Sequence, residues 1–294
     1  ITKYKNDPYD TTSLIHNYVT SLCKDSDGDI WVGTEGGLCK FNYELNNFER
    51  FDFELPNNII IKLKEDNQRG IWILSNVSGA SYYNKDTRRV INYMQNSNTE
   101  SIASNLINCI YIDKKENVWF GTDKGISIFD KTKNSFENIL LNETLNIPIT
   151  KHVIDIVENK QDNGILFITG SDLWQYNQQT KEFKKIALSI NNQQDNCPLF
   201  FNDLFIDKNN EIWISTSCGI IKYNFLTKNT LLLKKDVSNP NSISHNVGST
   251  IFEDQYHNIW IGTYGGGLNY FNNKTTPFKN IDIKDHSGNY DIFS

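Results

Sequence analysis

A short motif built around tryptophan recurs along the chain and limits what the chain can fold into. Its first copy, Asp27–Thr34, reads Asp-Gly-Asp-Ile-Trp-Val-Gly-Thr. Trp31 and Trp72 are 41 residues apart, and the later copies follow at intervals of 47. Spacing this regular indicates a repeat architecture, in which each unit packs against its neighbours. The further copies are Gly70–Ile73, Asn117–Thr122, Glu211–Thr216 and Asn258–Thr263, and a sixth, Gly164–Thr169, has Leu166 in place of Trp.

Each unit is predicted to contain four short strands. In the first unit, β-forming residues at 18–24, 30–34, 38–41 and 48–51 are separated by polar and Gly-containing turns. Four antiparallel strands in about 47 residues make one blade of a β-propeller. We therefore predict an all-β fold, a β-propeller of four-stranded antiparallel blades, with six repeats visible as part of a seven-bladed propeller.

The predicted propeller forms one domain over residues 1–294 and is expected to be a fragment of a longer chain. Residues 1–4 resemble an outer strand, and 289–294 resemble the inner strand that opens the first unit. The last segment would therefore begin a seventh blade. The repeat cores are expected near 18–51, 58–93, 105–139, 152–187, 201–234 and 246–283.

Composition excludes some classes of function. Hydrophobic residues make up 38% of the chain and aromatic residues 13%, which is enough for a buried core. A net charge of -6 argues against a general nucleic-acid or anionic-membrane binder. No apolar run approaches the length of a membrane-spanning helix. The five cysteines have no recurring spacing, so we predict small buried residues and not a disulfide or metal framework.

Most of the repeated residues are predicted to be structural. Large aromatic side chains dominate packing between sheets, so the motif tryptophans are assigned to the core. The acidic run Asp25–Asp29 is compatible with a calcium loop, but the bidentate Glu of such loops is missing and the other units lack the acidic alternation. An Asp-Gly turn is the preferred interpretation.

No catalytic motif is present in the sequence. There is no nucleophile elbow, zinc-protease helix or P-loop, and we predict neither enzyme activity nor a cofactor. A carboxylate pair drawn from two blades would leave no local signature, so enzyme activity stays open. His16, His152 and His245 precede the motif by similar distances and are expected to line the mouth of a channel as polar groups, in preference to binding a metal.

The pattern D-x-x-G-x-I-W-V-G-T-x-x-G-L-x-x-F-N resembles the repeat of the two-component regulator propeller family. Asp25–Asn42, Asp113–Asp130 and Asp254–Asn272 carry it, and three units also show the Ser-Leu or Ser-Ile preamble that ends in Asn. The chain departs from the pattern at Leu74-Ser75, at Leu166 and in having six repeats, which leaves the number of blades open.

This resemblance implies a periplasmic sensor region of a hybrid histidine kinase. The expected ligand is an oligosaccharide, and the kinase, not this domain, would be the enzyme. The expected partners are a second propeller and an immunoglobulin-like domain of the same chain, in a receptor that forms a homodimer. No direct contact with nucleic acid is expected from this domain. The alternatives are a propeller lyase or glycan-processing enzyme, and a scaffold that binds proteins.

Propeller topology places the candidate site on loops. Turns between the second and third strands open on the same face as the segments that lead into each inner strand. Polar residues of mixed charge there suit a ligand rich in hydroxyl groups, although each could equally serve only to solvate a loop. The predicted ligand-binding residues are His16, Asn17, Glu35, Asp123, Lys124, His152, His245, Asn246 and Tyr264.

Overall fold

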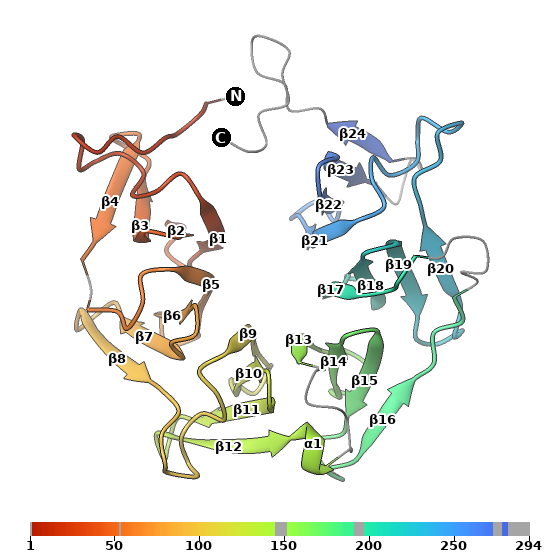
Figure 1. Cartoon of the computed structure of the whole chain (residues 1–294), viewed down its shortest axis with the longest axis horizontal. Coiled ribbons are helices and arrows are strands. Elements are labelled where there is room, and N and C mark those ends of the chain that lie inside the picture. The colour runs from red at the N-terminus through yellow and green to blue at the C-terminus, as the bar shows by residue number, and fades with distance from the viewer. Residues whose placement is uncertain (1, 53, 145–151, 191–196, 273–277, 282–294) are drawn as a thin grey trace. The chain divides into compact units, whose positions relative to one another are not determined.

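The computed structural model describes residues 2–52, 54–144, 152–190, 197–272 and 278–281 (Figure 1). The chain divides into two compact units, Ile1–Val153 and Ile154–Ser294, and each is described by itself. The described residues form four-stranded antiparallel sheets, called blades 1 to 6 in chain order. Strands within each sheet follow the order of the sequence, from inner to outer. The predicted all-β architecture of four-stranded propeller blades is confirmed.

The first unit contains blades 1 to 3 and also the first residue of blade 4. Blade 1 contains β1 (Val19–Lys24), β2 (Ile30–Thr34), β3 (Gly37–Asn42) and β4 (Asn47–Phe51). Blade 2 contains β5 (Ile60–Glu65), β6 (Gly70–Ser75), β7 (Ala80–Asn84) and β8 (Arg89–Tyr93). Blade 3 contains β9 (Ile107–Ile112), β10 (Val118–Thr122), β11 (Gly125–Asp130) and β12 (Ser135–Leu140), followed by the short helix α1 (Leu141–Thr144).

Blades 4 to 6 make up the second unit. Blade 4 contains β13 (Val153–Glu158), β14 (Ile165–Thr169), β15 (Asp172–Tyr176) and β16 (Phe183–Ile186). Blade 5 contains β17 (Phe201–Ile206), β18 (Glu211–Thr216), β19 (Gly219–Asn224) and β20 (Thr230–Leu233). Blade 6 contains β21 (Gly248–Glu253), β22 (Ile259–Thr263), β23 (Gly267–Phe271) and β24 (Lys279–Ile281).

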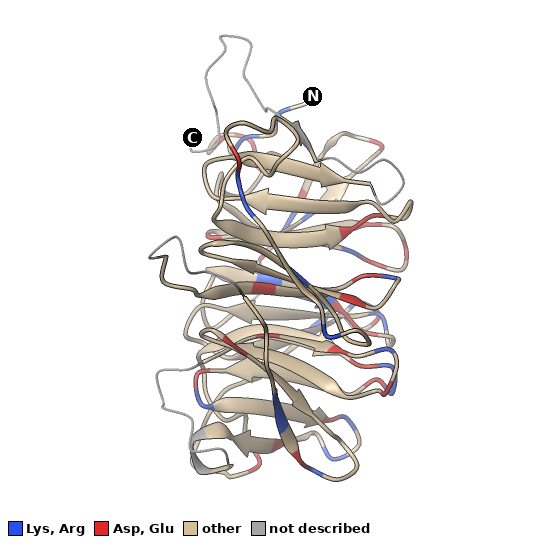
Figure 2. Ribbon diagram, turned by 90° about the vertical axis from the view of Figure 1, so that its right-hand side faces the viewer, with Lys and Arg blue, Asp and Glu red and all other residues tan. Residues whose placement is uncertain are grey.

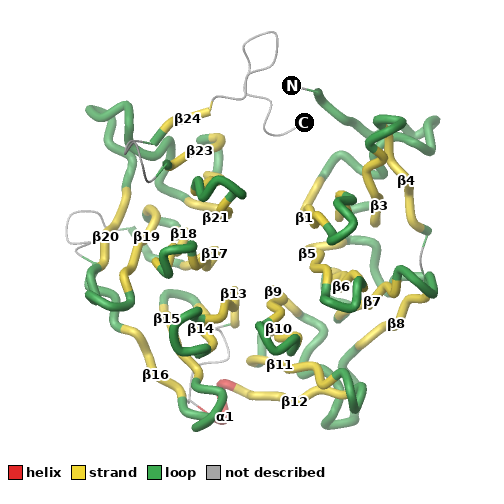
Figure 3. The backbone as a smooth tube through the Cα atoms, turned by 180° about the vertical axis from the view of Figure 1, so that it is seen from behind, coloured by secondary structure: helices red, strands yellow, loops and turns green. Residues whose placement is uncertain are grey.

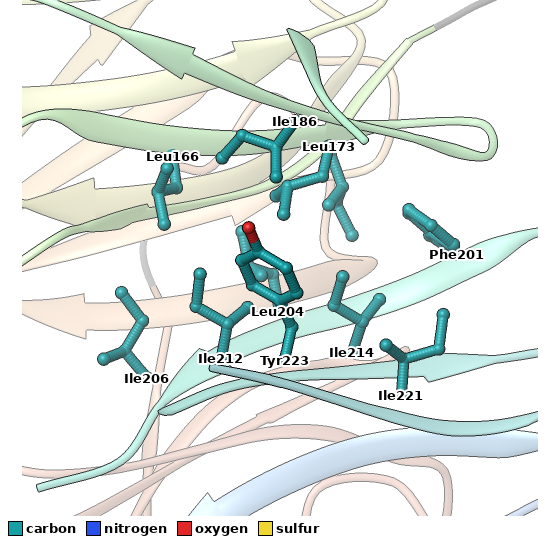
Figure 4. Close-up of a cluster of buried hydrophobic side chains, with 11 residues drawn as sticks. Leu166, Leu173, Ile186, Phe201, Leu204, Ile206, Ile212, Ile214, Ile221 and Tyr223 are labelled. Atoms are coloured by element: carbon teal, nitrogen blue, oxygen red, sulfur yellow. The ribbon is translucent and has the colours of Figure 1, made fainter. Parts of the chain in front are cut away.

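The motif residues lie on the second strand of each blade and fill the space between neighbouring sheets. Trp31, Trp72, Trp119 and Trp213 are each at most 2% exposed, which confirms their assignment to the core. Leu166 takes the same place in blade 4, where it packs with residues of blade 5 (Figure 4). The assignment is only partly right for blade 6, because Trp260 is half-buried. No described sheet covers that face of blade 6 within its own unit.

An aspartate six residues before the motif tryptophan connects the first turn to the core. Asp25 accepts the N–H groups of Asp27 and Asp29 through Oδ1, which makes the acidic run a turn, as predicted. Its Oδ2 accepts the indole N–H of Trp31 at 2.8 Å. This carboxylate is therefore committed to the fold. The same indole bond joins Trp119 to Asp113 at 3.0 Å, Trp213 to Asp207 at 3.1 Å and Trp260 to Asp254 at 2.9 Å.

Hydrogen bonds between inner strands hold neighbouring blades in register. In the first unit, where β1, β5 and β9 follow one another (Figure 3), Thr20 Oγ1 donates to Ile60 O at 2.6 Å. In the second unit, Asn202 repeats this bond with Gly248 O at 2.8 Å. These bonds place the starts of adjacent inner strands next to one another. The loops that precede those starts are therefore neighbours too.

Blade 1 has an inner-strand residue that lacks the cover its counterparts have. Leu22 is 66% exposed, whereas Leu63 and Leu204, at the same position in blades 2 and 5, are 4% and 3% exposed. Each of those counterparts packs against the motif residue of the preceding blade. The open face is what a further blade would cover, and the predicted seventh blade stays a prediction. The segment 289–294, assigned to it, lies outside the described residues.

The N-terminal segment does resemble the end of an outer strand, as expected. The Tyr4 ring meets Phe41 and Phe48 at 5.3 and 5.4 Å, and its hydroxyl donates to Asn46 at 2.6 Å. Tyr93, at the end of β8, makes the equivalent contacts with blade 3. Tyr4 therefore occupies the position of a preceding outer strand, although residues 2–5 form no strand.

Exposed lysines lie on the outer strand β16 and just after the outer strand β20 of the second unit (Figure 2). Lys184 and Lys185 are exposed on β16, and Lys235 is exposed just after β20. A charged edge strand resists pairing with the edge of another sheet. These lysines are therefore explained by protection of the edge and need no ligand.

Candidate ligand-binding site

The two sets of loops chosen from the sequence are bonded to each other. We call the residue immediately before each inner strand its lead-in residue. In blade 1, the N–H of Glu35, in the β2–β3 turn, donates to the carbonyl of the lead-in residue Tyr18 at 3.1 Å. Asp123 is bonded in the same way to Leu106 at 3.2 Å. The turn and the lead-in segment thus form one surface at the end of a blade that has this bond, called here the loop face. Asn76 with Ile59 at 2.8 Å, and Ser217 with Phe200 and Tyr264 with Val247 at 2.9 Å each, repeat the pattern.

The predicted site residues fall into three groups on this face. His16, Asn17 and Glu35 belong to blade 1, and His245, Asn246 and Tyr264 belong to blade 6. Asp123 and Lys124 lie in the β10–β11 turn, and His152 precedes Val153, whose carbonyl accepts a hydrogen bond from Asn108. The blade 6 group lies in the second unit, and the other two groups lie in the first.

The preamble asparagines form hydrogen bonds within their own loops. Asn17 Oδ1 accepts the N–H of Asn6 at 2.7 Å, and Asn246 Oδ1 accepts that of Lys235 at 2.7 Å. Asn105 repeats the bond with Gln95. These bonds close loops of equivalent structure, so the side-chain oxygens are occupied by the fold. Asn17 and Asn246, which were predicted to bind a ligand, each use the side-chain oxygen in a structural hydrogen bond, and their part in ligand binding stays a prediction.

We expect Asn246→Ala to loosen this loop. Losing one hydrogen bond of this kind costs about 1 kcal/mol, and the amide of Lys235, which donates to Asn246 Oδ1 at 2.7 Å, should exchange with solvent faster. Amide hydrogen exchange of the purified chain measures this. Asn241→Ala, at an exposed position of the same loop, is the control. Equal exchange in both variants would contradict the assigned role.

Each of the two preamble histidines uses its Nδ1 atom in a hydrogen bond within its own loop. His16 Nδ1 accepts the N–H of Tyr18 at 3.1 Å, and His245 Nδ1 accepts that of Val247 at 3.1 Å. An accepting Nδ1 carries no proton, so the neutral ring carries its proton on Nε2. Each ring packs against a glycine of the adjacent turn, where a Cβ on Gly36 would come within 2.8 Å of His16. These histidines are half-buried donors at the loop face.

The turn of blade 3 presents both signs of charge. Thr122 Oγ1 accepts the N–H of Lys124 at 3.2 Å and donates to Gly125 O at 3.0 Å, which fixes the turn. Lys124 is exposed and Asp123 is half-buried. Glu35, at the equivalent position in blade 1, is exposed. Together these groups can donate to and accept from hydroxyl groups.

Sequence reasoning missed the lead-in residues themselves. Tyr18 is 56% exposed, Leu106 is 41% exposed and Phe200 is 57% exposed. Tyr18 was predicted to start the first strand, and Leu106 and Phe200 were assigned no role. The available signal was their position directly after the preamble Asn, as in Asn17-Tyr18 and Asn105-Leu106, because the preamble loop ends there.

The prediction that no cysteine is disulfide-bonded is wrong. Cys197 and Cys218 form a disulfide with a Cα–Cα distance of 6.0 Å. Their spacing of 21 residues is not repeated elsewhere in the sequence. Only the fold brings the segment before β17 beside the β18–β19 turn. The prediction holds for the other cysteines. Cys39 and Cys109 are buried, and Cys23 is half-buried.

A cavity of about 690 Å³ lies away from the loop face, at the opposite end of blade 3. Its lining includes Lys131 and Lys133, which are paired with Asp66 and Asp130 at 3.1 and 3.0 Å. Cations that are already paired offer little to a ligand. Across the described ranges, no group of three or more His, Cys, Asp or Glu residues is arranged to hold a metal ion, and no helix is both long and apolar enough to span a membrane.

Comparisons with known proteins agree with the repeat pattern. A family model described as two component regulator propeller matches residues 13–36, 101–124 and 241–265. A relative named histidine kinase P4, from Formosa agariphila, is 30% identical over 236 residues. The match covers 74% of this chain but only 16% of that protein. The chain thus spans about a sixth of the length of this relative.

Two solved structures share the fold. The extracellular domain of a putative one-component system from Bacteroides thetaiotaomicron matches with a TM-score of 0.74 at 21% identity, covering 89% of this chain and 35% of that one. Virginiamycin B lyase from Staphylococcus aureus matches with a TM-score of 0.69 at 11% identity, covering 91% and 85%. At these identities the likeness shows the fold alone. The repeats and the family match together establish that the chain belongs to the two-component regulator propeller family.

Proposed function

We propose that this chain is the ligand-sensing propeller of a hybrid two-component signalling protein, which binds an oligosaccharide and signals to a histidine kinase. The observation that carries the proposal is the loop face. In the first unit, Glu35 lies beside the exposed ring of Tyr18, and Asp123 and Lys124 add an acceptor and a donor in the turn of blade 3. In the second unit, the lead-in residue Phe200 presents another exposed ring. A sugar offers hydroxyl groups and apolar C–H faces, and this combination suits both.

The disulfide supports a location outside the cytoplasm. Stable disulfides persist in oxidising compartments such as the bacterial periplasm and are rare in the cytosol. Cys197–Cys218 therefore favours the periplasm. In this proposal the chain is the extracytoplasmic part of an inner-membrane protein, with a second propeller and an immunoglobulin-like domain as covalent neighbours. The receptor is a homodimer, and this domain makes no direct contact with nucleic acid.

Enzyme activity is the alternative, and its support is the fold alone. The lyase from Staphylococcus aureus shares the propeller architecture at 11% identity. One fold hosts many functions, so a shared architecture assigns no chemistry. The proposal therefore assigns catalysis to the kinase region of the longer protein and ligand binding to this chain.

Calorimetry with a panel of oligosaccharides tests the proposal. The panel contains neutral hexose oligosaccharides and oligosaccharides that include uronic acids, titrated into the purified chain. We expect at least one to bind, and Lys124→Ala to weaken anionic members most because it removes an exposed cation of the loop face. Lys228→Ala, at an exposed lysine of the β19–β20 turn, is the matched control. Absence of binding across the panel would overturn the proposal.

A further inference from the structure

Two aromatic side chains are exposed on the loop face of the second unit. Phe200, the lead-in residue of blade 5, is 57% exposed, and Tyr264, in the β22–β23 turn of blade 6, is 67% exposed. Single exposed apolar residues are common on soluble proteins. Tyr256, at the opposite end of blade 6, is 75% exposed. Exposure alone therefore assigns no role, and what distinguishes Phe200 is how its backbone is held.

The backbone of Phe200 is fixed from both sides. Its N–H donates to Ser217 Oγ at 2.9 Å, and its carbonyl accepts the N–H of Ser217 at 2.9 Å. The Ser217 hydroxyl donates in turn to Pro198 O at 2.6 Å. The disulfide Cys197–Cys218 ties the same two segments together covalently. A ring carried on a fixed backbone loses little conformational freedom when a ligand binds against it.

Hydrogen bonds also bring the two aromatic residues to one stretch of the loop face. Asn202, two residues after Phe200, donates from Nδ2 to Gly248 O at 2.8 Å. The preceding carbonyl, that of Val247, accepts the N–H of Tyr264 at 2.9 Å. Phe200 and Tyr264 are therefore both anchored beside the Val247–Gly248 segment. They come from two different blades of one unit.

Polar groups of the same segment lie beside the rings. His245 is half-buried, with Nδ1 bonded to the N–H of Val247 and its ring proton on Nε2. The loop face at this point thus combines apolar rings with a directed donor. Pyranose rings present C–H groups on one face and hydroxyl groups at the rim, which is the chemistry this arrangement fits.

We propose that Phe200 and Tyr264 are the stacking residues of a sugar subsite in the second unit, and that the Ser217 bonds and the Cys197–Cys218 disulfide position Phe200 for it. This inference rests on the proposed oligosaccharide-binding function and assigns the residues that carry it. The ligand class is an oligosaccharide that offers an exposed C–H face to each ring.

The test compares variants that lose an aromatic ring with variants that keep one. Phe200→Ser and Tyr264→Ser remove a ring, whereas Phe200→Tyr and Tyr264→Phe keep one. Tyr256→Ser removes an exposed ring from the opposite end of blade 6. The probes are the neutral and uronic-acid oligosaccharides of the panel, titrated by calorimetry into the 294-residue chain. Thermal melting of every variant confirms that it is folded.

Each serine variant is expected to weaken the tightest-binding oligosaccharide by about tenfold in Kd, while the ring-keeping variants and Tyr256→Ser bind like the unmodified chain. If that chain binds an oligosaccharide and both serine variants bind it equally well, this inference is wrong and the proposed function stands. If the unmodified chain binds no member of the panel, both are wrong. Should Phe200→Tyr lose as much affinity as Phe200→Ser, stacking is excluded as the contribution of that residue.

Discussion

Replacing Trp213 by Ala is expected to lower the free energy of unfolding by about 3 to 5 kcal/mol. The side chain is 0% exposed and packs in the cluster that contains Ile251 and Ile261 of blade 6. Its indole N–H donates to Asp207 Oδ2 at 3.1 Å. The substitution therefore leaves a cavity and also a buried carboxylate oxygen without its donor.

Trp260 provides the matched control, because it makes the same indole bond but is only half-buried. We expect Trp260→Ala to cost less than half as much as Trp213→Ala. Urea unfolding followed by circular dichroism measures both. A loss of similar size in the two variants would show that burial between blades is not what makes these tryptophans structural.

Replacing Lys85 by Ala should cost about as much as the loss of a buried tryptophan. The ammonium group lies 2.9 Å from Asp25, 3.1 Å from Asp27 and 2.7 Å from Glu65, and its side chain is 12% exposed. The carboxylate of Asp25 is fully buried and that of Glu65 is 13% exposed. Removing the cation leaves these carboxylates buried without a partner charge, which in measured cases costs about 3 to 5 kcal/mol.

The pH dependence of this loss follows from the same contacts. Burial alone would lower the pKa of Lys85, but its hydrogen bonds to Glu65, Asp25 and Asp27 outweigh burial and raise that pKa. Burial alone would raise the pKa of Asp25, but hydrogen bonds from Trp31 and Lys85 lower it. Because the pKa of Asp25 is lower in the folded protein than in the unfolded chain, this carboxylate stabilises the fold at pH values above its ordinary pKa. That stabilisation is lost as the pH falls through the pKa of the folded state. The difference between Lys85→Ala and the unmodified chain should therefore shrink in acid.

Lys133→Ala is the control for Lys85→Ala. Lys133 pairs with Asp130 at 3.0 Å, but its side chain is 75% exposed, and solvent-exposed ion pairs contribute little to stability. Thermal and urea unfolding of the two variants, at neutral pH and in acid, give the comparison. Equal losses at neutral pH, or a Lys85→Ala loss that grows in acid, would contradict the assigned network.

The strands could be predicted from the sequence because they depend on local pattern. Alternating apolar residues, turn residues and the repeated Trp define each blade, and even Leu166 could be placed by its spacing. Burial of Trp260 could not be predicted in the same way, because it depends on which sheet lies beside it. The Cys197–Cys218 disulfide was missed for a related reason, since it joins a lead-in segment to a turn that only the fold brings together.

The structure brings the predicted turns and lead-in segments together, and their role in ligand binding stays a prediction. Propeller topology was enough to place Glu35 beside the blade 1 preamble. It was not enough to show that the side-chain oxygen of Asn17 accepts the N–H of Asn6, or that the Phe200 side chain is exposed. Both outcomes depend on hydrogen bonds within loops, and residue type alone does not specify those bonds.

The inner-strand bonds of Thr20 and Asn202 have a consequence for how such chains can diverge. Each bond spans one junction and uses the same strand position, so the contacts that set the register do not involve the crossovers between outer and inner strands. The crossover 52–59 is short and 94–106 is longer, yet β5 and β9 start at equivalent points. Insertions and deletions in these crossovers can therefore accumulate without shifting a sheet. A gene for such a protein can change its recognition surface while its scaffold stays the same.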